Sequence, residues 1–394
     1  MDGDSPAAMS TGGDLRRCRI MKQADVVVVG GGPVGLFAGL SLLQQGVDVV
    51  VLEARAGGSA GSRAIGIHPP ALRCLEQLGL IGAFLEAGTV VREASVFVDR
   101  RPLTRLRFDG CDPQHDGVLM VPQQQTERLL AEPLQDAGRI SYGVRVDSLE
   151  STADDIVLRG DGAELQVRWV LVCDGRHSAL RQALRVGMPV QAYAHGYIMG
   201  DFPDATDFGA AAAIFLGRQS LVESLPLPQN TRRWVVRLRS PQNACTADEI
   251  AAIVGQRTGH GLDAASCTMT SAFAAEQGIA ERLRKGRAIL LGDAAHVVSP
   301  IGGQGMNLGW LGAAALIPLL TQILNSTDPA APALSAWERQ VRSNWQRARR
   351  RAEANMFHGR PLRCPQLHRA LMHLMLDTPL RHRFVRHYTM DGFT

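Results

Sequence analysis

Lysine and paired cysteines are scarce in this chain of 394 residues, and each scarcity argues against a class of protein. Lysine occurs only at Lys22 and Lys285, so nearly all positive charge is on arginine, and the net charge is a mild +4. The densest basic run, residues 342–351, has the spacing of a solvated helix face, so nucleic-acid binding is not expected. The seven cysteines are scattered without a C-x-x-C motif, which favours a reducing cytoplasm over a disulfide framework.

Membrane, secretion and metal-binding signals are also missing. The longest apolar candidate, residues 313–324, contains Pro318, so we expect no integral membrane segment. Residues 1–22 lack the apolar stretch of a secretory signal, and we expect a disordered leader with Met9 or Met21 as alternative starts. The eleven histidines cluster only near the C-terminus, where a helix surface rich in arginine and histidine explains them, so no metal site is expected.

The strongest positive signal is the stretch of residues 24–53, which reads as strand, turn, helix and strand. Four valines at 26–29 predict a buried parallel strand, residues 34–45 predict a helix, and residues 47–52 predict a second strand that ends on Glu53. The turn carries the pattern G-x-G-x-x-G, formed by Gly30, Gly32 and Gly35. These glycines allow a tight turn, close approach of the backbone to a pyrophosphate, and packing of helix on strand.

Charge supports a dinucleotide at this turn. The helix directs its positive N-terminal end at the pyrophosphate, and the Glu53 carboxylate can accept both ribose hydroxyl protons of an adenosine. An ordinary glycine-rich turn is the alternative. The acid follows Gly30 by 23 residues in the expected strand order, which favours a dinucleotide site.

Two further strand–turn–helix motifs follow. In residues 169–184, a buried strand ends at Cys173, the dipeptide Asp174–Gly175 turns the chain, and Ser178 can cap a helix. Residues 288–316 repeat a strand, a Gly-Asp turn, a loop and a glycine-rich helix start. Between and around the motifs we expect two strands in 94–108, a helix over 126–138, short strands over 140–172, a β-rich domain over 187–276 and a helical C-terminal region broken at Pro329, Pro332, Pro361 and Pro379.

The three motifs, in this order, resemble the single-component FAD-dependent aromatic hydroxylases, the para-hydroxybenzoate hydroxylase-like class A flavoprotein monooxygenases. The resemblance covers most of residues 24–320. It implies an α/β fold: a Rossmann-like FAD-binding domain of the glutathione-reductase type, an inserted β-rich substrate domain and C-terminal helices. The implied division is a leader at 1–22, a FAD-binding domain at 23–95, 122–186 and 277–325, a substrate domain at 96–121 and 187–276, and a helical region at 326–394.

The resemblance also implies residue roles. Glu53 holds the adenosine ribose, Asp293 and Gln123 contact the ribityl chain, and Arg63 lies near the FAD phosphates. Asp174 belongs to a motif associated with both FAD and NAD(P)H, and a helix N-terminus around Met306 faces flavin N1 and O2. The implied cofactor set is Gly30, Gly32, Pro33, Val34, Gly35, Glu53, Ala54, Arg63, Gln123, Asp174, Gly292, Asp293, Pro300, Gly303, Gly305, Met306 and Asn307, and the implied catalytic set is Pro300, Gly302 and Gly303.

The implied activity is hydroxylation of a small phenolic, polycyclic or quinone-like aromatic molecule. Non-covalent FAD would react through a C4a-hydroperoxide with O2, and NADPH or NADH would be the transient reductant. The expected protein is a cytoplasmic monomer or homodimer. A reductase or oxidase of the same fold that inserts no oxygen is the alternative. A flavin-dependent halogenase is disfavoured, because it needs a lysine between flavin and substrate, and both lysines stand in the wrong places.

The substrate-contacting residues are left open by the sequence. His68 could reach the flavin region or pack at a helix start. Six other residues could line a pocket or belong to the core: Tyr193, His195, Tyr197, Met199, Phe202 and Phe215.

Overall fold

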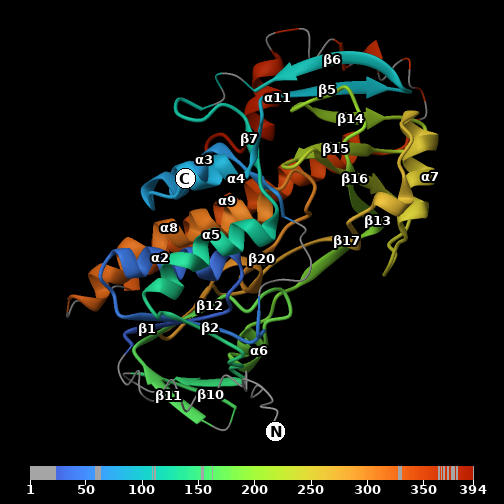
Figure 1. Ribbon diagram of the computed structural model, residues 1–394. Helices are drawn as coiled ribbons and strands as arrows, with labels where there is room; N and C mark the ends of the chain where they lie inside the picture. Colours follow the sequence, from blue (N-terminus) through green and yellow to red (C-terminus); the bar gives the residue numbers. More distant parts are fainter. Residues whose placement is uncertain are drawn as a thin grey trace, which may run out of the picture.

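The computed structural model describes residues 24–57, 64–108, 110, 112–151, 155–161, 163–326, 331–362, 364, 366, 369–370, 372–373, 378 and 380–393. The expected leader at 1–22 lies outside these residues, as do Arg63, Pro329 and Pro379. The protein is a mixed α/β fold in which a parallel sheet with covering helices stands at one end and a large sheet at the other (Figure 1).

The first motif builds the centre of a six-stranded sheet. Its strand order is β18-β19-β12-β1-β2-β8, and only β18 runs antiparallel to its neighbour. The strands are β1 (Val26–Val29), β2 (Val49–Glu53), β8 (Ile140–Tyr142), β12 (Trp169–Val172), β18 (Arg284–Lys285) and β19 (Ala288–Leu290). All four valines of β1 are buried, as the apolar run predicts for a central parallel strand.

Helices and two small antiparallel sheets accompany the two large sheets. The helices are α2 (Pro33–Gln44), α3 (Pro69–Gln77), α4 (Ile81–Ala87), α5 (Gln123–Asp136), α6 (Ala179–Ala183) and α8 (Gln304–Leu324). One three-stranded antiparallel sheet consists of β9 (Ser148–Ser151), β10 (Ile156–Gly160) and β11 (Ala163–Val167). A second consists of β3 (Gly66–Ile67), β4 (Thr89–Val91) and β7 (Val118–Met120). Helix α5 begins at Gln123, three residues before the predicted start.

The predicted β-rich region contributes most of an eight-stranded sheet, in the order β20-β17-β13-β16-β15-β14-β5-β6. Its strands are β5 (Glu93–Val98), β6 (Arg101–Arg107), β13 (Val190–Pro203), β14 (Ala212–Leu216), β15 (Val222–Leu227), β16 (Thr231–Arg237), β17 (Met269–Ile279) and β20 (His296–Val297). Helix α7 (Ala247–Thr258) packs on one face of this sheet. Strands β5 and β17 cross the expected domain boundaries at 95/96 and 276/277, and the division into domains stays a prediction.

The C-terminal region contains the long helix α9 (Ala331–His358) and the short helix α11 (Leu380–Tyr388). The expected break at Pro332 is wrong, because this proline lies in the first turn of α9, where no helical hydrogen bond to its nitrogen is needed. The break before Pro361 is confirmed, since α9 ends at His358.

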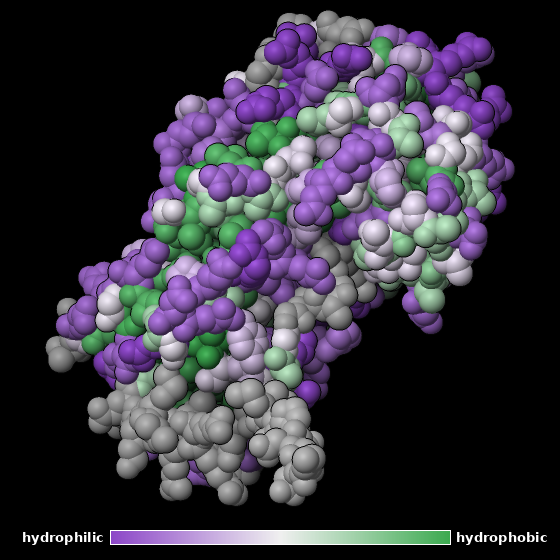
Figure 2. All heavy atoms as spheres, in the orientation of Figure 1, coloured by the Kyte–Doolittle hydropathy of each residue, from purple (hydrophilic) through white to green (hydrophobic). Residues whose placement is uncertain are grey.

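Helix α8 corrects a second expectation about proline. Pro318 does not end the apolar run, because it lies inside a helix of 21 residues that is long and apolar enough to cross a membrane. In this structure 61% of its most apolar window is buried, and a core helix passes the same test of length and composition. Most side chains on the face shown in Figure 2 are hydrophilic, with hydrophobic atoms in narrow bands between them.

Candidate active site

The glycine-rich turn is held by backbone packing that leaves no room for side chains. An ideal Cβ on Gly35 would lie 1.9 Å from the carbonyl oxygen of Gly30, and one on Gly30 would lie 2.3 Å from that of Cys173. Gly31 is equally restricted, because its Cβ would lie 2.8 Å from the Cβ of Glu53. Gly32 differs: its Cβ would meet no protein atom within 4 Å. The turn is therefore closed on its protein side and open at Gly32.

Glu53 lies at one side of this turn, in a cavity of about 500 Å³. Its Oε2 accepts a hydrogen bond from the backbone N–H of Gly31 at 2.6 Å, and its Oε1 accepts from the Nε of Arg55 at 2.7 Å. Burial by itself raises the pKa of Glu53, but hydrogen bonds from Arg55 and Gly31 outweigh burial, and the pKa lies below its usual value. The carboxylate is therefore ionised at neutral pH, as an acceptor of ribose hydroxyl protons must be.

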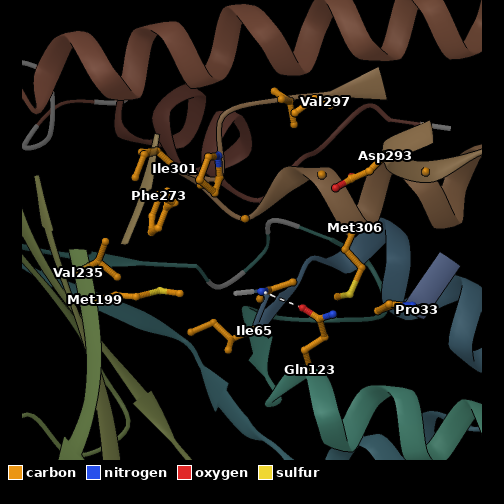
Figure 3. Close-up of a pocket in the computed structure, with 18 of the residues that line it drawn as sticks. Pro33, Ile65, Gln123, Met199, Val235, Phe273, Asp293, Val297, Ile301 and Met306 are labelled. Carbon is orange, nitrogen blue, oxygen red and sulfur yellow. Dashed lines mark hydrogen bonds between the residues drawn. The ribbon is translucent and has the colours of Figure 1, made fainter. Parts of the chain in front are cut away.

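A second cavity of about 600 Å³ lies on the other side of the turn. The glycine-rich turn, Gln123 and the loop before α8 form one wall, and the eight-stranded sheet forms the other. Figure 3 shows Pro33, Gln123 and Met306 on one side, facing Met199 and Val235 of the sheet. The Gln123 side-chain oxygen accepts from the backbone N–H of Ala64 at 3.4 Å, which ties the start of α5 to the cavity wall. The two cavities thus flank one glycine-rich turn.

The loop before α8 borders the larger cavity. Gly302 and Gly303 have φ angles of +91° and +64°, a left-handed conformation that glycine adopts without strain. Asn307 fixes this loop against β3, because its amide donates to the carbonyl oxygens of Gly303 at 2.7 Å and Gly66 at 2.9 Å. The N-terminus of α8 is thereby held beside the cavity, where its dipole favours negative charge.

His68 reinforces the same loop. Its ring Nε2 lies 2.8 Å from the carbonyl oxygen of Gly302, which requires a proton on Nε2, and its backbone N–H donates to Asn307 Oδ1 at 2.8 Å. Burial lowers the pKa of His68 to about 4, so the ring is neutral at physiological pH. The residue directly precedes α3, in line with the expected position at a helix start, and it also lines the larger cavity; its contact with the flavin stays a prediction.

The Asp174 motif braces the site. Ser178 accepts a hydrogen bond from the backbone N–H of Arg181 at 2.9 Å and caps α6, as predicted. The Arg181 guanidinium donates to the carbonyl oxygen of Ala294 at 3.0 Å, next to Asp293. Asp174 accepts from the backbone N–H of Leu180 at 3.2 Å. The second motif therefore supports the third one.

The comparison with protein families shows to which family this chain belongs. A family model described as FAD binding domain matches residues 23–350. The chain belongs to this FAD-binding family. The predicted resemblance to class A flavoprotein monooxygenases is confirmed by this match and by the relatives below.

Three similar proteins show the range of activities named among the relatives of this chain. The chain is 33% identical over 298 residues to a rifampicin monooxygenase of Streptomyces venezuelae, covering 72% of this chain and 61% of the relative. It is 30% identical over 305 residues to a dialkyldecalin synthase of Streptomyces rugosporus, covering 72% of this chain and 64% of the relative. The structure of a p-nitrophenol 4-monooxygenase from Pseudomonas putida superposes with a TM-score of 0.84 at 21% identity, covering 95% of this chain and 99% of that one.

FAD fits the described residues at both ends. The free space at Gly32 would admit a pyrophosphate, and the ionised carboxylate of Glu53 would accept hydrogen bonds from ribose hydroxyls. In the part of the chain that the structure describes, one oxygen of Asp174 is buried without a hydrogen-bond partner. No cluster of three or more metal-ligating residues occurs in that part.

Most residues predicted to bind FAD come together at the larger cavity: Gly32, Pro33, Val34, Gln123, Gly292, Asp293, Pro300, Gly303, Gly305 and Met306. Gly302, predicted as catalytic, lines it as well. Glu53 lines the smaller cavity. Gly30, Gly35, Ala54, Asp174 and Asn307 are not among the residues lining either cavity, and Arg63 lies outside the described residues. The roles of all these residues stay predictions.

The sequence did not distinguish the residues that line the cavity from those that pack in the core. Of the six open candidates, Met199 lines the cavity, whereas Phe202 and Phe215 pack in the core beneath α7. Glu223 and Tyr388, which also line the cavity, were missed. Neither belongs to a motif, and only the pairing of distant strands and the docking of α11 reveal them. Gly31 and Arg55 were missed too, although Gly31 stands in a visible run of three consecutive glycines, Gly30–Gly32.

Proposed function

We propose that this protein is an FAD-dependent monooxygenase that uses NAD(P)H and O2 to hydroxylate a phenolic, polycyclic or quinone-like aromatic molecule. The observation that supports this proposal most is the larger cavity, where the loop before α8 and the residues around Gln123 face a mixed apolar and polar surface of the eight-stranded sheet. A flavin ring on the loop side and a substrate ring on the sheet side would then share one cavity.

The proposed path of FAD follows the two cavities. Glu53 would hold the adenosine ribose, and the backbone at Gly32 with the N-terminus of α2 would hold the pyrophosphate. Asp293 and Gln123 would contact the ribityl chain, and the first turn of α8 would stabilise negative charge on the ring. We also propose that the FAD-binding domain is of the glutathione-reductase type and carries an inserted substrate domain, with the domain boundaries that the sequence predicts.

When bound, the flavin would supply transfer of one oxygen atom to the ring through the intermediate that the resemblance implies. The residues of the chain would orient the substrate and exclude water. Met199, Val235 and Phe273 present apolar side chains to the cavity. An apolar wall protects a reactive intermediate, because water would decompose it and waste the reductant. The cavity of about 600 Å³ suits a small aromatic molecule beside the ring.

NAD(P)H would act as a transient reductant. The sequence has no second G-x-G-x-x-G unit after a strand, so we propose no lasting nicotinamide pocket. Reduction of the flavin would be much faster with substrate bound, and a stopped-flow comparison with and without an aromatic substrate tests this. Equal rates would contradict it.

Labelled dioxygen tests the proposal itself. The purified protein should show a flavin absorption spectrum and, with NAD(P)H and a fused-ring phenol, give a product that carries one oxygen atom from ¹⁸O2. A protein that shows no flavin spectrum after reconstitution with FAD contradicts the proposal at its first step.

The second candidate is an enzyme of the same fold that inserts no oxygen. The likeness to a dialkyldecalin synthase, whose name describes no oxygen insertion, favours keeping this candidate. Substrate turnover with flavin bound and no label in the product would select it.

A further inference from the structure

Glu223 is a carboxylic acid on the wall of the larger cavity. It lies in β15 directly opposite Val235 of β16, and Val235 lies directly opposite Met199 of β13. Cross-strand partners point to the same face of a sheet, and all three residues line the cavity. Figure 3 shows Met199 and Val235 directed into this space. The Glu223 side chain therefore belongs to the surface that faces the proposed substrate.

The structure provides this acid with no cationic partner. Among the described residues, no hydrogen bond and no neighbouring charge contributes to the pKa of the Glu223 carboxyl group. The arginine on the same wall, Arg233, is engaged elsewhere, because its Nε and Nη2 each lie 2.7 Å from an oxygen of Asp201. Burial raises the pKa of Glu223 to about 7. A half-buried acid without a charge partner, directed at a cavity, is a candidate for a role in binding or chemistry.

We compared Glu223 with the titratable side chains around it as possible acceptors of a substrate proton. Tyr388 of α11 lines the same cavity, and burial together with the charge of Glu223 raises the pKa of Tyr388 above its usual value, so this phenol stays protonated. The neighbour on β14 is the apolar Ile214. The other titratable or charged groups that line the cavity or interact with Glu223 are Tyr197, Arg233, His68, Asp293, the Arg176–Glu276 ion pair and Cys173, whose thiol stays protonated because burial raises its pKa.

We propose that Glu223 is the base that accepts the ring hydroxyl proton of the aromatic substrate, an inference that rests on the function proposed above. The substrate O–H bond breaks, the proton moves to a carboxylate oxygen of Glu223, and the electron pair stays on the ring oxygen and enriches the ring. The ring carbon that then receives oxygen becomes more nucleophilic. O2 and NAD(P)H, the co-reactants of the proposed function, supply the oxidation. The proton leaves Glu223 when the product is released.

The test compares Glu223→Gln with Glu223→Asp in the FAD-loaded protein, with 2-hydroxyanthraquinone as probe and substrate. Glutamine keeps the shape and a hydrogen-bonding group but cannot take the proton. We expect kcat/KM to fall by about 10²–10⁴-fold in Glu223→Gln, mostly through kcat, and its rise with pH near 7 to disappear. Glu223→Asp should restore part of the rate and the pH dependence. Glu86→Gln, an exposed change on α4, is the matched control.

A second readout does not depend on turnover. The phenol and phenolate forms of the probe differ in colour, so the absorption of the bound probe reports its ionisation. Wild-type protein should increase the phenolate fraction at pH 7 relative to Glu223→Gln. Identical spectra and identical pH profiles in the two proteins would overturn the inference, and so would failure of the probe to bind. Failure of the proposed function is a different result: no flavin spectrum, or a product without oxygen label, in the wild-type protein.

Discussion

The open position at Gly32 makes a sharp prediction, because it separates the needs of the fold from the needs of the cofactor. Gly32 has φ −78° and ψ 177°, which alanine adopts freely, and its Cβ would meet no protein atom within 4 Å. Alanine is a poorer N-cap than glycine, so Gly32→Ala should cost the apoprotein about 1 kcal/mol or less. Its methyl group would project toward the space where we place the pyrophosphate.

FAD affinity should therefore fall much more than stability. Loss of one charge-assisted hydrogen bond between the backbone and the pyrophosphate corresponds to roughly 1.5–3 kcal/mol, or about ten- to a hundredfold in Kd. Quenching of flavin fluorescence during titration of the apoprotein measures the Kd, and thermal unfolding without FAD measures stability. The melting temperature of the apoprotein should change by no more than about 4 °C.

Two other alanine variants are the controls. Gly82→Ala, on the exposed side of α4, also meets no atom within 4 Å and should change neither quantity appreciably. Gly35→Ala should destabilise the apoprotein by more than about 3 kcal/mol, because its Cβ would lie 1.9 Å from a carbonyl oxygen of the turn. Wild-type FAD affinity in Gly32→Ala would refute the placement of the pyrophosphate at this turn.

Three more predictions follow from the site. Glu53→Gln removes the negative charge of the carboxylate that would accept hydrogen bonds from the ribose hydroxyls, so FAD affinity should fall about tenfold or more by equilibrium titration, and unchanged affinity would contradict this. Gly303→Leu should retain the flavin spectrum but release peroxide without product, because the side chain blocks the space beside the ring; coupled turnover measured by chromatography would refute it. Burial lowers the pKa values of His68 and His296 to about 4, so the unfolded protein binds more protons below pH 6.5. The free energy of unfolding should therefore fall between pH 6.5 and 4, by roughly 3 kcal/mol per histidine, and His296→Gln should flatten a urea-unfolding series across that range.

Local patterns were enough to predict the elements around FAD. The turn at Gly30–Gly35, the cap at Ser178 and the helix start after Gly303 each depend on residues within a few positions of one another, and all three are confirmed. Gly303 is an example, because its left-handed φ of +64° is a conformation that glycine adopts without steric cost, so a glycine in this position can be read from the local sequence.

The substrate wall could not be predicted in the same way, because it depends on pairing between strands far apart in the chain. Alternation along β13 places Met199 and Phe202 on opposite faces, but the sequence does not say which face meets the cavity. Packing of α7 against the Phe202 face decides this. Glu223 reaches the cavity for the same reason, through its register with Val235.

Tyr388, which closes part of the cavity from α11, has a consequence for how the protein is made. The described residues around the glycine-rich turn and the start of α8 all precede residue 325, and Tyr388 follows them by more than sixty positions. At about 5–20 residues per second, several seconds of translation separate the two. The nascent chain can therefore contain the elements of the cofactor site and the sheet wall of the cavity before Tyr388 exists, so that FAD has access to an incomplete cavity until the last helix docks.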